Sequence, residues 1–95
     1  MIVELQVLPS PAGTADDRYA HVEAAIAVIA GSGLRYEVGP LGTSVEGEPD
    51  EVWSVVRRAH EATLAAGADG VVSVIKVAQR VQPGTTIASL TDKFR

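Results

Sequence analysis

The sequence predicts a small α+β domain with its elements in the order β-α-β-β-α-β. Four short stretches alternate apolar and polar residues, which is the period of a β-strand, and two longer stretches repeat apolar residues with the period of an α-helix. A chain of 95 residues is too short to form two stable cores, so residues 1–95 are expected to fold as one domain.

A strand and a helix are predicted first. Residues 2–8 alternate as a strand, and Pro9 ends it because proline cannot donate to a sheet ladder. Thr14 and the acids after it predict a helix start, since a hydroxyl and negative charges stabilise a helix N-terminus. This helix is expected over about residues 15–30, with an apolar stripe made of Tyr19, Val22, Ile26 and Ile29.

A hairpin, a second helix and a fourth strand follow. Residues 34–38 and 43–46 are predicted strands, and the short turn between them predicts antiparallel pairing. The second helix is expected to start at Pro49 and to end at Gly67, because proline suits the first helical position and glycine the C-terminal cap. Residues 71–78 form the last predicted strand.

Two βαβ units of this kind predict a ferredoxin-like βαββαβ arrangement, with both helices on one face of a four-stranded antiparallel sheet. The core is expected over about residues 2–80, and residues 81–95 are expected to form a peripheral tail with one short helical turn.

The fourth predicted strand is apolar on both faces. One face carries Val72 and Val74, and the other carries Val71, Ile75 and Val77. Because the helices cover only one face of the sheet, we expect a second copy of the chain to cover the open face. The alternative is that strand ends and loops shield these valines.

Composition and charge exclude several classes of protein. The absence of cysteine rules out a disulfide scaffold, a thiolate zinc site, an iron–sulfur cluster and a cysteine nucleophile. Eight basic residues against twelve acidic ones give a net charge of −4, which argues against nucleic acid as a partner. No apolar run reaches the roughly 20 residues that span a bilayer, and no signal peptide is evident, so a cytoplasmic protein without membrane contact is expected.

Residues for catalysis or metal binding are sparse. His21 and His60 are expected at the surface or at an interface, because neither has a second ligand at helical spacing. No serine lies in a G-x-S-x-G elbow that would present it to a base. Lys76 in an apolar strand needs an acid partner, for which Glu4 and Glu46 are the candidates. We therefore expect no enzyme activity, no metal and no cofactor.

Four runs of the sequence resemble the small single-domain thiamine-binding proteins related to YkoF. These runs are Ser32-Gly-Leu-Arg-Tyr-Glu-Val38, Leu41-Gly-Thr-Ser-Val-Glu-Gly47, Arg58-Ala-His-Glu61 and Ser73-Val-Ile-Lys-Val77. The resemblance covers about residues 2–78 and departs at residues 9–13 and past residue 80. It implies a ferredoxin-like fold, assembly as a dimer of dimers through the sheet, and binding of thiamine or its hydroxymethylpyrimidine portion without catalysis.

The resemblance and the chemistry of thiamine together select five candidate ligand-binding residues. An aminopyrimidine needs an apolar or aromatic wall with a donor and an acceptor, and a thiazolium cation needs negative potential. The residues chosen for these properties are Tyr36, Thr43, Ser44, Glu46 and Ser73. Thr43 and Ser44 point to opposite faces of one strand, so a single chain cannot gather all five in one pocket. A site at a subunit junction would relax this limit.

Two functions follow from these observations. The leading one is non-catalytic binding of a thiamine-like molecule for sequestration, delivery or sensing, in a dimer or tetramer. The alternative is a ligand-free assembly module that uses the open sheet face for protein–protein contact.

Overall fold

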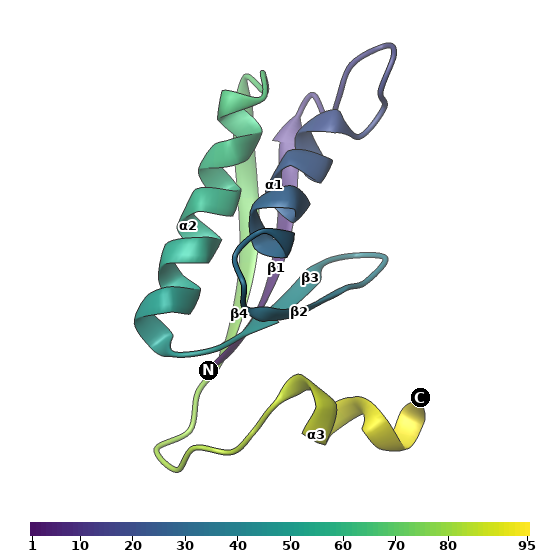
Figure 1. Cartoon of the computed structure of the whole chain (residues 1–95). Coiled ribbons are helices and arrows are strands. Elements are labelled where there is room, and N and C mark those ends of the chain that lie inside the picture. Colours follow the sequence, from purple (N-terminus) through teal and green to yellow (C-terminus); the bar gives the residue numbers. More distant parts are fainter.

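Four strands and three α-helices make up the computed structural model, which describes all 95 residues (Figure 1). The elements are β1 (Ile2–Ser10), α1 (Ala20–Ala30), β2 (Arg35–Val38), β3 (Thr43–Glu46), α2 (Pro49–Ala65), β4 (Gly70–Ala78), α3 (Ile87–Thr91) and the 3-10 turn η1 (Asp92–Phe94). The strands form one sheet in the spatial order β2-β3-β1-β4, and all neighbours are antiparallel. The predicted α+β class and four-stranded antiparallel sheet are confirmed.

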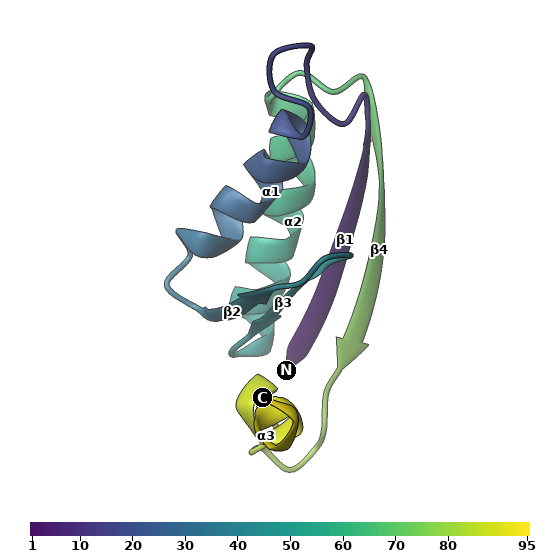
Figure 2. The ribbon, with the colours of Figure 1, turned by 90° about the vertical axis from the view of Figure 1, so that its right-hand side faces the viewer.

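Helices α1 and α2 lie on the same face of the sheet, which we call the helix side (Figure 2). We call the other face the open face. Val3 of β1 lies opposite Val45 of β3 on the helix side, and the next residue, Glu4, lies opposite Ser44 and Lys76 on the open face. The strand register thus assigns alternate residues to opposite faces.

The hydrophobic core fills the space between the helix side of the sheet and the two long helices. It contains nine buried residues, which are Val3, Leu5, Ala25, Ile29, Val45, Val52, Val55, Val56 and Ala59. Helix α2 supplies four of them at helical spacing, and Pro49 starts this helix as predicted. This aliphatic core fixes the positions of the helices over β1 and β3.

Helix α1 begins at Ala20, so the predicted start near residue 15 is wrong. Thr14 and Asp17 form a local turn instead. The Asp17 N–H donates to Thr14 Oγ1 at 3.0 Å, and the Thr14 N–H donates to Asp17 O at 2.8 Å. The hydroxyl that was expected to cap the helix is therefore used before the helix begins. The buried stripe of α1 is also different from the predicted one and consists of His21, Ala25 and Ile29.

His21 is buried, so the expectation that it lies at the surface is wrong. Its side chain is 3% exposed, and its Nδ1–H donates to Pro11 O at 2.7 Å. The other side of the ring faces Gly67, where an added Cβ would lie 3.3 Å from His21 Nε2. His21 thus joins the connection between β1 and α1 to the end of α2.

The open face carries exposed apolar side chains beside the ion pair of Lys76 and Glu4. Val72 is 64% exposed and Val74 is 45% exposed, both on β4. Lys76 Nζ lies 3.8 Å from Glu4 Oε1, so Glu4 is the acid partner of the two that were predicted. None of the helices combines the length and the apolarity that a membrane crossing requires.

The C-terminal tail folds back toward the β2–β3 hairpin (Figure 1). The Ile87 N–H donates to Glu46 Oε1 at 3.2 Å, the Ile87 side chain is buried, and Arg95 forms an ion pair with Glu37. The helical turn expected in this segment is present as α3 and η1.

Candidate functional site

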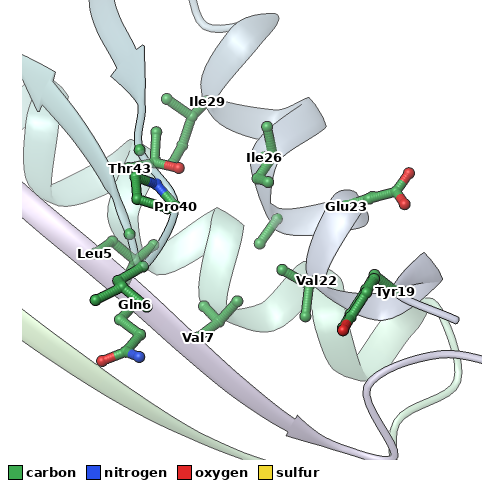
Figure 3. Close-up of a pocket in the computed structure, with 14 residues that line it drawn as sticks. Leu5, Gln6, Val7, Tyr19, Val22, Glu23, Ile26, Ile29, Pro40 and Thr43 are labelled. Atoms are coloured by element: carbon green, nitrogen blue, oxygen red, sulfur yellow. The ribbon is translucent and has the colours of Figure 1, made fainter.

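A cavity of about 520 Å³ lies on the helix side, between α1, β1 and the turn that joins β2 to β3 (Figure 3). We call it the helix-side cavity. Its volume falls within the range of about 300–1,000 Å³ that is typical of small-molecule sites. The side chains that matter most for its chemistry are Tyr19, Val22, Glu23, Ile26, Leu41 and Thr43.

The helix-side cavity exists because the face of α1 that packs on the sheet is not the predicted apolar face. His21, Ala25 and Ile29 point most deeply inward, so Val22 and Ile26 remain only half-buried along the flank of α1. These two side chains face the cavity from α1, and Leu5 and Val7 line it from β1 (Figure 3). The walls of the cavity are therefore largely aliphatic.

Thr43 is the one buried polar side chain among the lining residues. It is 4% exposed and lies on the helix side, opposite Leu5 of β1 and Val38 of β2. Its hydroxyl has no hydrogen-bond partner within the chain, yet it is not sealed from solvent. The Thr43 hydroxyl is therefore free to bond to a ligand in the cavity, and a ligand that covered it without a hydrogen bond would lose the one that water can make.

One charged residue lines the cavity, and it is an acid. This residue is Glu23, and no lysine or arginine lines the cavity. The Tyr19 ring stands at the mouth and is 52% exposed. Arg18 already stacks on this ring, with its Cζ 5.5 Å from the ring centroid, so the ring can accept a positive charge on a face. The site therefore suits an apolar ring system that carries a positive charge.

The other predicted site residues do not join Thr43. Tyr36 and Ser73 also lie on the helix side but do not line the cavity. The Tyr36 ring is 40% exposed, which agrees with the expectation that it is at least half-buried. The Ser73 hydroxyl lies 2.5 Å from His60 Nδ1 and so contacts α2.

Ser44 and Glu46 lie on the open face, on the far side of the sheet from the cavity. Glu46 is occupied by the backbone of the tail, through its bond from Ile87. A single chain therefore does not bring the five predicted residues together, as their alternation along the strands had indicated. No three histidine, aspartate or glutamate side chains converge in a way that could hold a metal ion.

Most residues of the helix-side cavity were missed at the level of sequence. The helical period predicts Tyr19, Val22 and Ile26 in the core stripe of a longer helix and gives no sign of a role for Glu23. One signal in the sequence could have found them. His21, Ala25 and Ile29 form a second possible stripe, and one helix face cannot bury both stripes fully.

The sequence model of the thiamine-binding protein family matches residues 3–95. The chain belongs to this family. A UPF0045 protein of Clostridium perfringens is 34% identical over 94 residues, which cover 98% of this chain and 95% of that protein. In this thiamine-binding family protein the match runs through the tail to residue 95, beyond the stretch of about 2–78 in which the resemblance was noticed.

Two solved structures are similar to this thiamine-binding family protein over nearly its whole length. A Bacillus cereus structure, described as a domain of unknown function, is 39% identical with a TM-score of 0.88, and the match covers 99% of this chain and 88% of that one. A Thermotoga maritima structure, described as a candidate thiamine biosynthesis or salvage protein, is 29% identical with a TM-score of 0.83, and the match covers 99% of this chain and 97% of that one.

Proposed function

We propose that the protein binds thiamine, or its hydroxymethylpyrimidine portion, in the helix-side cavity without converting it chemically. The observation that carries the proposal is the Thr43 hydroxyl, which has no hydrogen-bond partner within the chain and lies in the wall of a largely apolar cavity. Membership of the thiamine-binding family and the similarity to a Thermotoga maritima protein named for thiamine biosynthesis or salvage support the same ligand.

The arrangement of the lining residues favours one orientation of thiamine. The pyrimidine ring would pack between the aliphatic side chains of α1 and β1, where the Thr43 hydroxyl can donate to a ring nitrogen or accept from the amino group. The thiazolium ring would lie at the mouth, near the carboxylate of Glu23 and the ring of Tyr19. Each ring of the ligand then meets the chemistry that it requires.

The lining residues also favour binding over catalysis. The cavity has one carboxylate and no histidine, lysine or cysteine, so it lacks the hydroxyl–histidine and cysteine–histidine pairs of common nucleophilic catalysis. We therefore propose a role in sequestration, delivery or sensing of the ligand. The cytoplasmic location stays a prediction.

Calorimetric titration of the full chain tests this function. Thiamine, thiamine phosphate and hydroxymethylpyrimidine would each be titrated into the protein, with a neutral aromatic compound of similar size, such as benzamide, as the control. We expect saturable binding of thiamine and of hydroxymethylpyrimidine, with one site per chain. Binding of neither compound would contradict the proposed function.

Replacing Thr43 with valine is expected to weaken the binding of both thiamine and hydroxymethylpyrimidine by roughly fivefold to tenfold. The shape of the side chain is kept while one hydrogen bond to the ligand is lost. The free energy of unfolding is not expected to fall, because the Thr43 hydroxyl makes no hydrogen bond within the chain and valine keeps the shape of the side chain. Ser44→Ala, which removes a neighbouring hydroxyl on the open face, is the control and should bind normally.

Replacing Glu23 with glutamine is expected to weaken thiamine binding by about tenfold and to leave hydroxymethylpyrimidine binding within twofold. Only thiamine carries the cationic ring that the carboxylate attracts. Glu51→Gln makes the same change of charge on an exposed turn of α2, away from the cavity, and serves as the control in the same titrations. An equal loss for both ligands would show that Glu23 does not recognise the cation.

We also propose that the protein self-associates through the open face, as a dimer or a tetramer. Leu8, Val72 and Val74 are 48%, 64% and 45% exposed there and form neighbouring parts of β1 and β4. This exposed aliphatic surface is also what favours the second candidate function, an assembly module that binds protein without a small ligand. The two functions are compatible, because the cavity and the open face lie on opposite sides of the sheet.

We assign the domain to the ferredoxin-like class and treat residues 1–95 as one domain. The order of elements from β1 to β4 and the strand order β2-β3-β1-β4 support this assignment. The tail from residue 81 onward is proposed to be peripheral to ligand binding, because none of its residues lines the helix-side cavity.

A further inference from the structure

The turn between β2 and β3 forms one wall of the helix-side cavity at its mouth. Its four residues, 39–42, all line the cavity. Leu41 is 78% exposed, although its side chain is aliphatic and stands beside an apolar cavity. An aliphatic side chain so placed gains free energy when a ligand covers it, because apolar surface is then removed from water.

The turn is anchored on one side and weakly held on the other. Gly42 lies against β1, since a Cβ added there would come within 3.2 Å of Leu5 O. Across the turn, one backbone hydrogen bond of 2.8 Å joins the Gly39 N–H to Gly42 O. The preceding strand, β2, is four residues long and pairs only with β3, and Val38 at its end is 49% exposed. The tip of the turn is therefore held by fewer contacts than Gly42, which packs against β1.

We propose that Leu41 closes over the outer half of the bound ligand and sets the preference for a two-ring ligand over a one-ring ligand. This inference rests on the proposed function and adds a specificity residue to the same cavity. A one-ring ligand held at Thr43 fills the inner part of the cavity. A second ring reaches the mouth, where Leu41 on the turn faces the residues that α1 contributes.

The burial of the Leu41 side chain against the outer ring would make thiamine bind more tightly than a one-ring ligand. Truncation to alanine removes most of the aliphatic surface that the outer ring would cover. We expect thiamine to bind about tenfold more weakly to Leu41→Ala, and hydroxymethylpyrimidine to bind within threefold of the wild-type affinity. Most of the loss is expected in the dissociation rate, because a closed lid slows the escape of the ligand.

The experiment compares wild type, Leu41→Ala and Val81→Ala in titrations with both compounds. Val81 is 99% exposed in the tail, so Val81→Ala is the matched loss of an exposed aliphatic side chain away from the cavity. Leu41→Ala should fold normally because the side chain packs little in the free protein. Hydrogen exchange adds a second measurement, in which thiamine should protect the amides of Leu41 and Gly42 more than hydroxymethylpyrimidine does.

The outcomes separate this inference from the proposed function. If the wild-type chain binds neither compound, the proposed function fails and the closing role of Leu41 fails with it. If the wild type binds and Leu41→Ala binds thiamine within twofold of it, only the role of Leu41 is overturned. An equal loss for thiamine and hydroxymethylpyrimidine would also overturn it, because Leu41 would then not distinguish two rings from one.

Discussion

Ile26→Trp is expected to abolish thiamine binding, with a loss of affinity on the order of 100-fold or more. Ile26 lines the helix-side cavity from α1 and is only half-buried, so a larger side chain at this position enters the cavity and not the core. The indole ring would occupy the volume that the ligand needs. Because the cavity measures about 520 Å³, the fold should accept the added atoms.

The control for this substitution is Ala27→Trp, which adds the same ring to the next residue of α1, on its exposed side. Calorimetry should show normal binding for Ala27→Trp and none for Ile26→Trp. Circular dichroism and thermal unfolding should show that both variants fold. Normal binding by a folded Ile26→Trp variant would place the ligand outside the helix-side cavity.

Val74→Asp is expected to dissociate the proposed oligomer, with an increase of roughly 100-fold in the dissociation constant. Val74 lies on the open face, opposite Gln6, so the helices do not cover it. A carboxylate buried at this point without a partner costs several kcal/mol, and a two-fold interface would contain two of them. The monomer should remain folded, because Val74 is 45% exposed in the isolated chain.

Light scattering over a range of protein concentrations measures this effect, and circular dichroism checks the fold. Val81→Asp introduces the same charge at a fully exposed position of the tail and should leave the molecular mass unchanged. A wild-type protein that is monomeric at all concentrations would contradict association through the open face. Ligand binding to the helix-side cavity would be unaffected by that result.

The strands could be predicted well because their signals are local, although Pro9 does not end β1 as predicted: the strand runs to Ser10, with Pro9 opposite Val71 of β4. The alternation along β4 assigned Val72 and Val74 to one face and Ile75 to the other, and the register with β1 bears this out. The short connection between β2 and β3 was sufficient to predict their pairing. In each case the residues that decide the structure are neighbours in the sequence.

The cavity could not be predicted because it depends on where α1 begins. A threonine followed by acids predicts a helix start, yet Thr14 and Asp17 satisfy each other in a turn before the helix. In the structure the inward side of α1 carries His21, Ala25 and Ile29, and Val22 and Ile26 line the cavity. Composition and spacing do not distinguish these two uses of the same residues.

The five candidate ligand residues have the side chains that thiamine needs. The chemistry of a side chain does not show where the fold places it. Thr43 lines the cavity, whereas Glu46 accepts a hydrogen bond from the backbone of Ile87. The partners in that bond are 41 residues apart in sequence. A contact of this range leaves no local pattern, so Glu23, the acid that lines the cavity, could be identified only in the folded chain.

Because His21 and Gly67 are in contact, the residue types at these two positions are expected to covary among relatives. Gly67 has a φ of +125°, which already disfavours any side chain, and a Cβ at this position would lie 3.3 Å from Nε2 of His21, closer than an ordinary contact. A relative with a larger residue at position 67 is therefore expected to have a smaller or displaced side chain at position 21. That relative also loses the hydrogen bond to Pro11 and must hold the connection before α1 in another way. Among aligned relatives, the identities at these two positions should change together, although 46 residues separate them along the chain.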